Sequence, residues 1–304
     1  MSDAHGRIPR VLSVAGSDPT GGAGIQADLK SIAANRGYGM AVVTALVAQN
    51  TRGVRAMHVP GAGFLTEQLR AVSDDVAIDA VKIGMLADAE SVGAVAHWLH
   101  TTRPPRVVLD PVLLSSSGHR LLDAAGERAL PALFEAVDVI TPNLDELAAL
   151  TRAPRAGTWR DALEQASLLS AAYDMIVLVT GGHAEGPAST DALVDAGGRL
   201  GKHGSLFEAT SPRIHTRNTH GTGCSLSSAI ATIQARVNDW PRALVAAKQW
   251  LHDSLAHADE LDVGSGAGPL HHFHALWEGV ETRALPGIHV SVQDARALTS
   301  SAAT

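Results

Sequence analysis

The stretch VLSVAGSDPTGGAGIQADLKSIAAN, residues 11–35, has the pattern of a strand, a glycine-rich loop and a helix in that order. Val11–Ala15 is a short aliphatic run, typical of a strand that is buried on both faces. After the loop, apolar side chains recur at the spacing of a helix that buries one face: Ile25, Leu29, Ile32 and Ala33. This unit predicts the beginning of an α/β domain.

Further short aliphatic runs follow, separated by amphipathic helical stretches. They are Ala41–Val47, Ala80–Ile83, Arg106–Leu109, Val137–Ile140 and Met175–Val179. The alternation predicts a mostly parallel, doubly wound sheet with helices on both faces. Two more polar runs, Gly53–Val59 and Asp191–Val194, indicate edge strands or a small flap. Helices are expected over residues 225–236 and 241–259.

Composition limits the classes of function. The chain has 304 residues, 45% of them apolar, a net charge of −7 and 4% aromatic residues. Nucleic-acid binding is not expected without a basic stripe or stacking residues, and no apolar run is long enough to span a membrane. A single cysteine and the lack of a signal-peptide pattern favour the cytoplasm. We expect one domain over residues 1–304, with a core from about 10 to 277 and a tail over 278–304.

Three loops follow predicted strands, where open α/β sheets bind their ligands. In the first, AGSDPTGGAG, residues 15–24, the small residues Gly21, Gly22 and Ala23 would let the backbone approach a small molecule closely. An ordinary tight turn between a strand and a helix would have the same composition.

The second region combines LDPV (109–112) with TPNLDE (141–146). Asp110, Asn143 and Glu146 carry the oxygen ligands that Mg²⁺ prefers when it bridges nucleotide phosphates. Asn143 followed by two acidic residues is equally typical of a capped helix N-terminus. Both interpretations stay open at this point.

The third loop is NTHGTGCS, residues 218–225, which enters an apolar helical run. Gly221 and Gly223 would let an anion approach the free N–H groups of the helix N-terminus. The same terminus would lower the pKa of Cys224 and favour a thiolate. Alternatively, Cys224 is a small packing residue, which is the commoner case.

Other polar residues give weaker signals. LHHFHALW groups His271, His272 and His274, but metal sites usually draw their ligands from separated segments. Lys248 lies on the last predicted helix, where a solvated lysine is the ordinary expectation.

Together these motifs resemble a known family. AGSDPTGGAGIQADLKS, ALVAQNTRGV, VKIGMLAD, LDPVLLSSSG, ITPNLDELAAL, NTHGTGCSLSSAIA and GPLHHFHALW are similar, in this order, to blocks of the hydroxymethylpyrimidine and hydroxymethylpyrimidine-phosphate kinases of thiamin biosynthesis. These enzymes belong to the ribokinase-like superfamily, and the resemblance runs from about Val11 to Trp277.

The resemblance implies a three-layer ribokinase-like fold, ATP and Mg²⁺, and two phosphoryl transfers: first to a pyrimidine alcohol, then to its monophosphate. The superfamily commonly dimerises, so a homodimer is expected. The positions implied for the substrate are Gly16, Ala23, Asp28, Gln49, Met85 and Val112. Those implied for the nucleotide are Asn143, Glu146, Thr180, Gly182 and Lys248, with Asp110 and Glu146 for the metal. The anion hole falls on Gly221, Thr222, Gly223 and Cys224, where Cys224 takes the place of the aspartate base of sugar kinases.

The chain departs from the family at two phosphate-handling places. Thr180 stands where many relatives carry lysine, and Ser115 and Ser116 replace a frequent alanine–lysine pair. Both departures put affinity for the phosphorylated second substrate in doubt. Pyridoxal kinase is an alternative, because some relatives with a cysteine in the anion hole phosphorylate vitamin B6 alcohols. A non-catalytic pyrimidine sensor is a further alternative, supported only by the missing cations.

Overall fold

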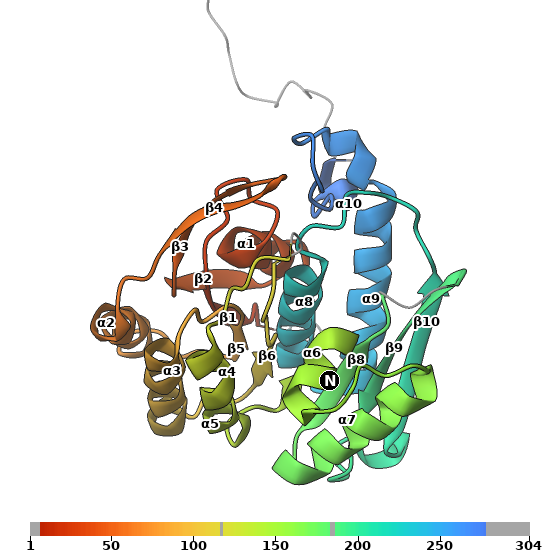
Figure 1. Cartoon of the computed structure of the whole chain (residues 1–304), viewed down its shortest axis with the longest axis horizontal. Coiled ribbons are helices and arrows are strands. Elements are labelled where there is room, and N and C mark those ends of the chain that lie inside the picture. Colours follow the sequence, from red (N-terminus) through yellow and green to blue (C-terminus); the bar gives the residue numbers. More distant parts are fainter. Residues whose placement is uncertain (1–6, 116–117, 183–185, 278–304) are drawn as a thin grey trace, which may run out of the picture. The chain divides into compact units, whose positions relative to one another are not determined.

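The computed structural model describes residues 7–115, 118–182 and 186–277. Within the compact unit that ends at His274, eight strands form one sheet (Figure 1). In spatial order they are β10 (Leu206–Pro212), β9 (Ala188–Val194), β8 (Ile176–Thr180), β7 (Val139–Ile140), β6 (Val107–Leu109), β5 (Ala80–Ile83), β1 (Arg10–Ala15) and β2 (Tyr38–Val43). The predicted tail over 278–304 lies outside the described residues.

All neighbours from β2 to β8 pair in parallel. The parallel strands are aliphatic along almost their whole length, because helices cover the sheet on both faces. Only β9 and β10 run antiparallel to their neighbours. The mostly parallel α/β class predicted from the sequence is therefore confirmed.

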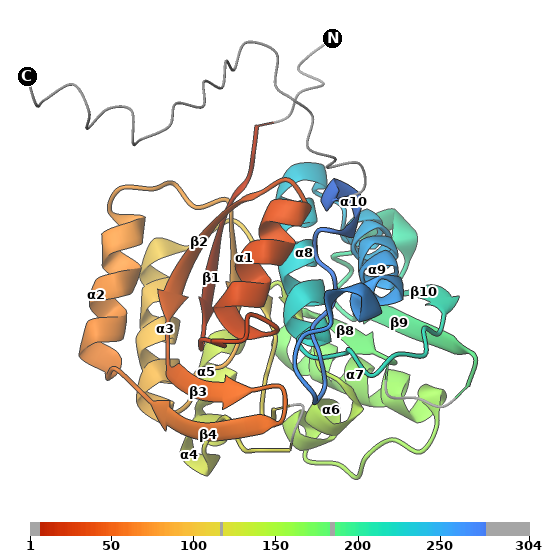
Figure 2. The same cartoon turned by 90° about the horizontal axis from the view of Figure 1, so that it is seen from above.

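Helices form a layer on each face of the sheet, which is seen from above in Figure 2. One layer contains α2 (Ala62–Ser73), α3 (Ala89–Thr102), α4 (Ala124–Ala129), α5 (Pro131–Phe134), α6 (Leu144–Thr151) and α7 (Trp159–Tyr173). The other contains α1 (Gly24–Ala34), α8 (Thr222–Val237) and α9 (Trp240–Ala256). Short helical segments are η1 (Gly201–His203), η2 (Ala258–Leu261) and α10 (His274–Trp277). Each face of the sheet packs its own apolar core against its helices.

A separate antiparallel hairpin of β3 (Leu46–Asn50) and β4 (Gly53–His58) stands beside the main sheet. We call it the flap. The single strand predicted over 41–47 is wrong, because the chain leaves the sheet after β2. Thr44 Oγ1 donates to the Met85 carbonyl at 2.6 Å, and the amide of Ser17 donates to the Ala45 carbonyl at 2.9 Å. These bonds turn the chain out into the flap, which was one of the two forms expected for residues 53–59.

The other polar run lies inside the main sheet. Residues 191–194 belong to β9, which is not an edge strand because β10 pairs along its outer side. β10 was not predicted, since its side chains alternate between half-buried and exposed without an aliphatic run. The last predicted helix ends at Ala256 rather than 259, and η2 follows it. In the part of the chain that the structure describes, no helix has the length and apolar character to cross a membrane.

Candidate active site

A cavity of about 750 Å³ opens at the carboxyl ends of the parallel strands, between the flap and the N-terminus of α8. Its wall includes all but one of the site residues implied by the resemblance: Gly16, Ala23, Gln49, Met85, Asp110, Val112, Asn143, Glu146, Thr180, Gly182, Gly221, Thr222, Gly223, Cys224 and Lys248. The exception is Asp28, which lies fully buried beneath the cavity. Gly21 and Gly22 of the first loop do not line the cavity. Segments that are far apart in the sequence thus meet at one place, as the loop positions predicted.

One end of the cavity is apolar. Met85 packs with Ala45, Val47 and Leu121 in a small cluster separate from the two main cores, and Val112 lies against it. A Cβ at Gly16 would stand 3.0 Å from the Met85 sulfur, so a side chain there would displace Met85. This end offers apolar walls, with the Gln49 carboxamide as a polar group on the flap strand β3.

The helix α8 begins at the cavity with a glycine whose position leaves no room for a side chain. Gly221 is its N-cap, in the left-handed region at φ 80°, and a Cβ there would lie 1.9 Å from the Gly22 carbonyl oxygen. Thr222, Gly223 and Cys224 form the first helical turn, whose N–H groups have no partner within the helix. The Thr222 amide donates to the Thr219 carbonyl at 3.3 Å, so the N–H groups of Gly223 and Cys224, together with the helix dipole, can hold an anion.

Cys224 is half-buried at this helix start. The expected lowering of its pKa is wrong. Burial raises the pKa of Cys224 to about 12; the ammonium of Lys82 opposes this effect, and the carboxylates of Asp110 and Asp28 add to it. The helix terminus does not outweigh these groups, so the side chain is a thiol at neutral pH.

A buried layer of charge lies under the cavity floor. Lys82, on β5, is fully buried, and its Nζ lies 2.9 Å from Asp28 Oδ1 and 3.9 Å from Asp110 Oδ2. Ser13 and Ser228 donate to the Asp28 carboxylate at 2.6 and 2.9 Å. Burial alone would lower the pKa of Lys82, but the nearby carboxylates raise it above its ordinary value. Lys82 therefore stays charged, and Asp28 acts as its partner rather than as part of the cavity wall.

Asn143 and Glu146 form the helix cap that was the alternative interpretation of their motif. Asn143 Oδ1 accepts the amides of Asp145 and Glu146 at 2.9 Å, and Glu146 Oε2 accepts the Asn143 amide at 3.0 Å. Burial and the nearby Asp110 charge raise the pKa of Glu146 to about 8. Burial is also the main cause that raises the pKa of Asp110. Both carboxyl groups lie on the cavity wall, and burial disfavours their charged forms. A divalent cation bound there would favour the charged forms.

Their chemistry fits Mg²⁺, which binds through one or two carboxylates, water and substrate phosphates. A metal site made wholly of protein side chains would need at least three ligands close together. Among residues 7–115, 118–182 and 186–277, no three His, Cys, Asp or Glu side chains gather as a metal site.

In the histidine-rich motif, His272 Nε2 lies 2.8 Å from Ser225 Oγ. Burial lowers the pKa of His272 to about 3, so it is a neutral residue that packs against α8.

Lys248 is not the solvated lysine that its helix suggested. Its Nζ lies 2.6 Å from Asp191 Oδ2, and both side chains are buried. Asp191 Oδ1 also accepts the Gly181 amide at 3.0 Å, which ties the pair to the turn after β8. Thr180 ends β8 in the same wall. Ser115 lines the cavity as well, whereas Ser116 lies outside the described residues.

Sequence reasoning missed Asp18, Lys82, Asp191 and His220. Lys82 had a signal, because a lysine within an otherwise aliphatic strand must find a buried partner. Asp18 and His220 lie within quoted motifs, but their partners are about two hundred positions away along the chain. Only the fold brings such pairs together.

The family model and the sequence relatives indicate one family. A family model described as phosphomethylpyrimidine kinase matches residues 18–271. A hydroxymethylpyrimidine/phosphomethylpyrimidine kinase of Escherichia coli is 48% identical over 267 residues, which cover 88% of this chain and 98% of that protein. A thiamine biosynthesis multifunctional protein of Corynebacterium glutamicum is 51% identical over 266 residues, and the chain spans only 34% of its length. A pyridoxal kinase of Bacillus subtilis, solved as an ADP complex, has a TM-score of 0.77 at 29% identity and covers 89% of this chain and 99% of its own.

Proposed function

The chain belongs to the phosphomethylpyrimidine kinase family, and from this premise we propose that it transfers phosphoryl groups from ATP to 4-amino-5-hydroxymethyl-2-methylpyrimidine. The monophosphate formed first is the substrate of a second transfer, which yields the diphosphate for thiamine biosynthesis. The observation that carries this proposal is that one cavity is lined both by an apolar cluster with a carboxamide and by a helix N-terminus with two carboxyl groups. The ATP requirement also favours a cytoplasmic location.

The apolar end suits a flat pyrimidine ring. The Gln49 carboxamide offers one donor and one acceptor, which match the exocyclic amine and ring nitrogen of a 4-aminopyrimidine. Met85 and Val112 would cover the ring, and Gly16 leaves room for Met85. Ala23, at the end of the first loop, brings the backbone close to the ring.

The transfer itself is an in-line displacement. The hydroxymethyl oxygen attacks the γ-phosphorus of ATP, the bond from this phosphorus to the β–γ bridging oxygen breaks, and ADP leaves with that electron pair. The N–H groups of Gly221, Gly223 and Cys224 would stabilise the charge on the transferred group. Because the transition state is loose, little charge develops on the attacking oxygen. Its proton leaves late, to an oxygen of the transferred phosphoryl group.

In this account Cys224 shapes the pocket and does not act as the base. A thiol with a pKa of about 12 carries its own proton at neutral pH and cannot accept another. Its small volume fits the crowded start of α8, between the backbone of Gly24 and the Asp110 carboxylate.

Asp110 and Glu146 would hold Mg²⁺, which neutralises phosphate charge when it is bound. The Lys248–Asp191 pair would fix the turn over the nucleotide, where Thr180 and Gly182 also line the wall. Since Thr180 carries no charge, we expect the monophosphate to bind weakly. Thr180→Lys should lower the KM for the monophosphate more than the KM for the alcohol.

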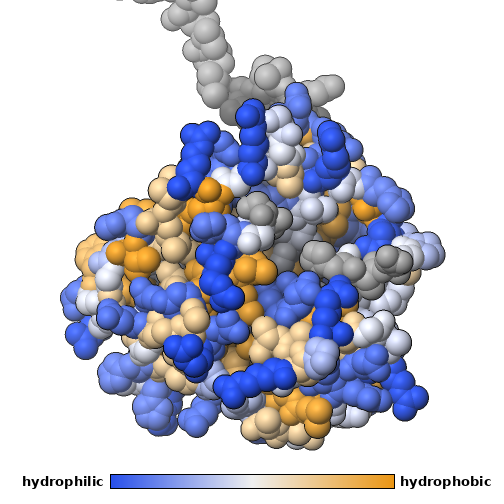
Figure 3. Space-filling model, viewed as in Figure 1, coloured by the Kyte–Doolittle hydropathy of each residue, from blue (hydrophilic) through white to orange (hydrophobic). Residues whose placement is uncertain are grey.

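We also propose a homodimer formed through the flap. Leu46 on β3 and Met57 on β4 are exposed, and so is Phe64 on the neighbouring α2. Apolar surface is seen on the side that carries β3 and β4, at the left of Figure 3. Exposed apolar surface of this kind often marks a protein interface. Light scattering after size exclusion, with Leu46→Glu as the disrupting variant, tests this proposal.

A competition assay tests the substrate. The enzyme is offered the pyrimidine alcohol and pyridoxal at equal concentration with ATP and Mg²⁺, and both phosphorylated products are quantified. The proposal predicts that the pyrimidine product dominates and that Gln49→Leu removes most of the preference. Dominant pyridoxal phosphate in the wild type would favour vitamin B6 salvage instead, and binding of the alcohol without any transfer would indicate a sensor.

A further inference from the structure

The loop that would receive the substrate and the loop that forms the anion hole are joined by a buried carboxylate–imidazole contact. Asp18 is fully buried. Its Oδ2 lies 2.8 Å from His220 Nε2, and the same oxygen accepts the amides of Gly22 and Ala23 at 3.1 and 2.8 Å. An ionised carboxylate only accepts hydrogen bonds, so Nε2 of His220 carries the proton in this contact.

Several observations show that Asp18 is held as a carboxylate. Its Oδ1 accepts both the amide and the hydroxyl of Thr20, at 2.9 and 2.7 Å. Burial by itself would raise the pKa of Asp18, but the hydrogen bonds from His220 and Thr20 lower it well below its ordinary value. A single carboxylate thus fixes three backbone N–H groups of the first loop and one imidazole of another segment.

The two loops also touch through their backbones, which leaves little freedom between them. A Cβ at Gly22 would stand 2.5 Å from the His220 ring, and a Cβ at Gly221 would stand 1.9 Å from the Gly22 carbonyl oxygen. His220 directly precedes Gly221, the N-cap of α8. A shift of the imidazole would therefore move the start of the anion hole relative to the first loop.

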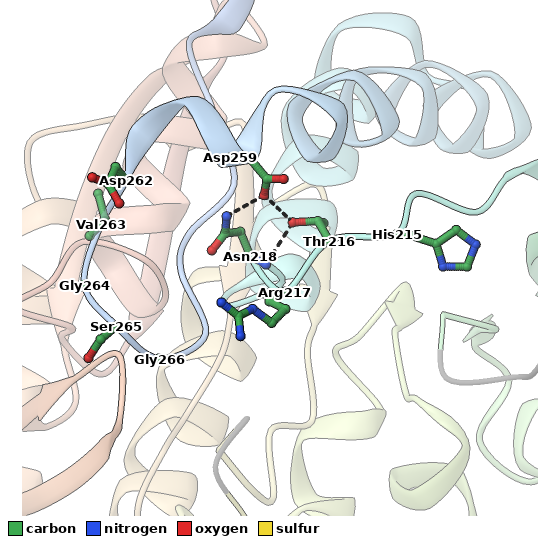
Figure 4. A pocket seen from close by; sticks show the side chains of 10 residues that line it. All are labelled: His215, Thr216, Arg217, Asn218, Asp259, Asp262, Val263, Gly264, Ser265 and Gly266. Atoms are coloured by element: carbon green, nitrogen blue, oxygen red, sulfur yellow. Dashed lines mark hydrogen bonds between the residues drawn. The ribbon is translucent and has the colours of Figure 1, made fainter.

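The segment that carries His220 is anchored from its outer side as well. Asp259 Oδ1 accepts Thr216 Oγ1 at 2.6 Å and Asn218 Nδ2 at 2.7 Å. These residues line a second, polar hollow of about 570 Å³ (Figure 4). Asn218 Oδ1 in turn accepts the Gly268 amide, and the Gly268 carbonyl accepts the His220 amide at 3.0 Å. The bonds to Asp259 and Gly268 hold the segment on its outer side, and the His220 imidazole connects its inner side to Asp18.

We propose that Asp18 and His220 are a positioning pair that sets the distance between the bound alcohol and the anion hole. This inference rests on the proposed function and adds two residues to it. Asp18 does not line the cavity, so it acts through the amides of Gly22 and Ala23 and through His220. His220 does line the cavity, and the experiment must separate a direct contact with the substrate from positioning through Asp18.

A double-mutant cycle makes this separation. The variants are His220→Ala, Asp18→Asn and the double variant, and kcat/KM is measured for the alcohol at saturating ATP. Each single variant should lose on the order of 10²-fold, because a misplacement of about 1 Å has that effect. If the two residues act as one unit, the kcat/KM of the double variant should lie within about threefold of that of the less active single variant.

Three further variants and readouts complete the design. His220→Gln keeps an N–H donor near the position of Nε2 and should recover at least about tenfold of the loss. His215→Gln changes an exposed residue of the same segment, which lines only the outer hollow, and should behave as wild type. The Kd of ADP, measured by calorimetry, should stay within about twofold in every variant, because the nucleotide end is untouched. If His220→Ala does not fold, His220→Leu, which also removes the donor but keeps more volume, takes its place in the cycle.

Losses that multiply to about 10⁴-fold in the double variant would overturn the proposal, and so would a wild-type kcat/KM in His220→Ala. A loss of ADP affinity equal to the loss of kcat/KM would also overturn it, because that result indicates general damage. Failure of the proposed function is recognised separately. In that case the wild type does not phosphorylate the pyrimidine alcohol, and the cycle is measured with whichever alcohol it does phosphorylate.

Discussion

The protonation state of Cys224 leads to a prediction that the single cysteine of the chain makes easy to test. At pH 8 a free cysteine with a pKa near 8.5 is roughly one quarter thiolate. With a pKa of about 12, Cys224 would be thiolate in only about one molecule in 10⁴. Only the thiolate reacts with iodoacetamide, so we expect alkylation on the order of 10³-fold slower than for a free cysteine.

The assay follows the mass of the intact protein over time in iodoacetamide, at several values between pH 7 and pH 10. The rate should rise about tenfold for each pH unit over the whole range, without a plateau. The same protein unfolded in urea is the control, because its only reactive thiol is then Cys224 with an ordinary pKa. A folded rate within tenfold of the unfolded rate at pH 7, or a plateau below pH 9, would refute the assignment of a thiol.

The consequence for catalysis follows from the same pKa. If Cys224 only shapes the pocket, Cys224→Ala should lower kcat by less than about tenfold, short of the 10²- to 10⁴-fold effect of a removed general base. A larger loss, with substrate affinity unchanged, would return the base role to Cys224.

Other predictions concern single residues. Gly221→Ala should lower kcat at least about 10²-fold, because the added Cβ would meet the Gly22 carbonyl. Gly93 lies at an exposed helix position with open space around it, so Gly93→Ala should raise the free energy of unfolding in urea by about 0.5–1 kcal/mol. Glu146 keeps its proton in the folded state up to about pH 8 but loses it near 4.5 when unfolded, so the free energy of unfolding should fall as the pH rises through this window. In urea titrations without Mg²⁺, the free energy of unfolding of Glu146→Gln should depend less on pH in this window. An unchanged pH dependence in this variant would show that Glu146 is not the cause. His272 stays neutral in the folded state down to about pH 3, so stability should fall as the pH drops from 6.5, and less so in His272→Gln.

Much of the fold could be predicted because its strands are aliphatic runs and its helices have apolar faces. β1 and α1 occur almost where residues 11–35 placed them. The boundary between β2 and the flap could not be predicted, since hydrogen bonds from Thr44 and Ser17 to other segments cause that turn. β10 was missed because it has no aliphatic run, and its pairing with β9 and packing against the core exist only in the folded chain.

The site divides in a similar way. Loops at the carboxyl ends of strands were expected to meet, and they line one cavity. The effect of the buried charges on Cys224 was not foreseen, because it depends on Lys82, Asp28 and Asp110, which come from three separate segments of the chain. A helix terminus alone suggested a thiolate, and the sum of burial and two carboxylates reverses that suggestion.

Product analysis by mass spectrometry tests the proposed kinase activity most directly. Purified protein is incubated with 4-amino-5-hydroxymethyl-2-methylpyrimidine, ATP and Mg²⁺, and samples are taken over time. The account predicts that the monophosphate appears first and the diphosphate later, with one ADP formed for each phosphoryl group transferred. An unchanged alcohol, in a preparation that binds ADP and phosphorylates pyridoxal, would contradict it.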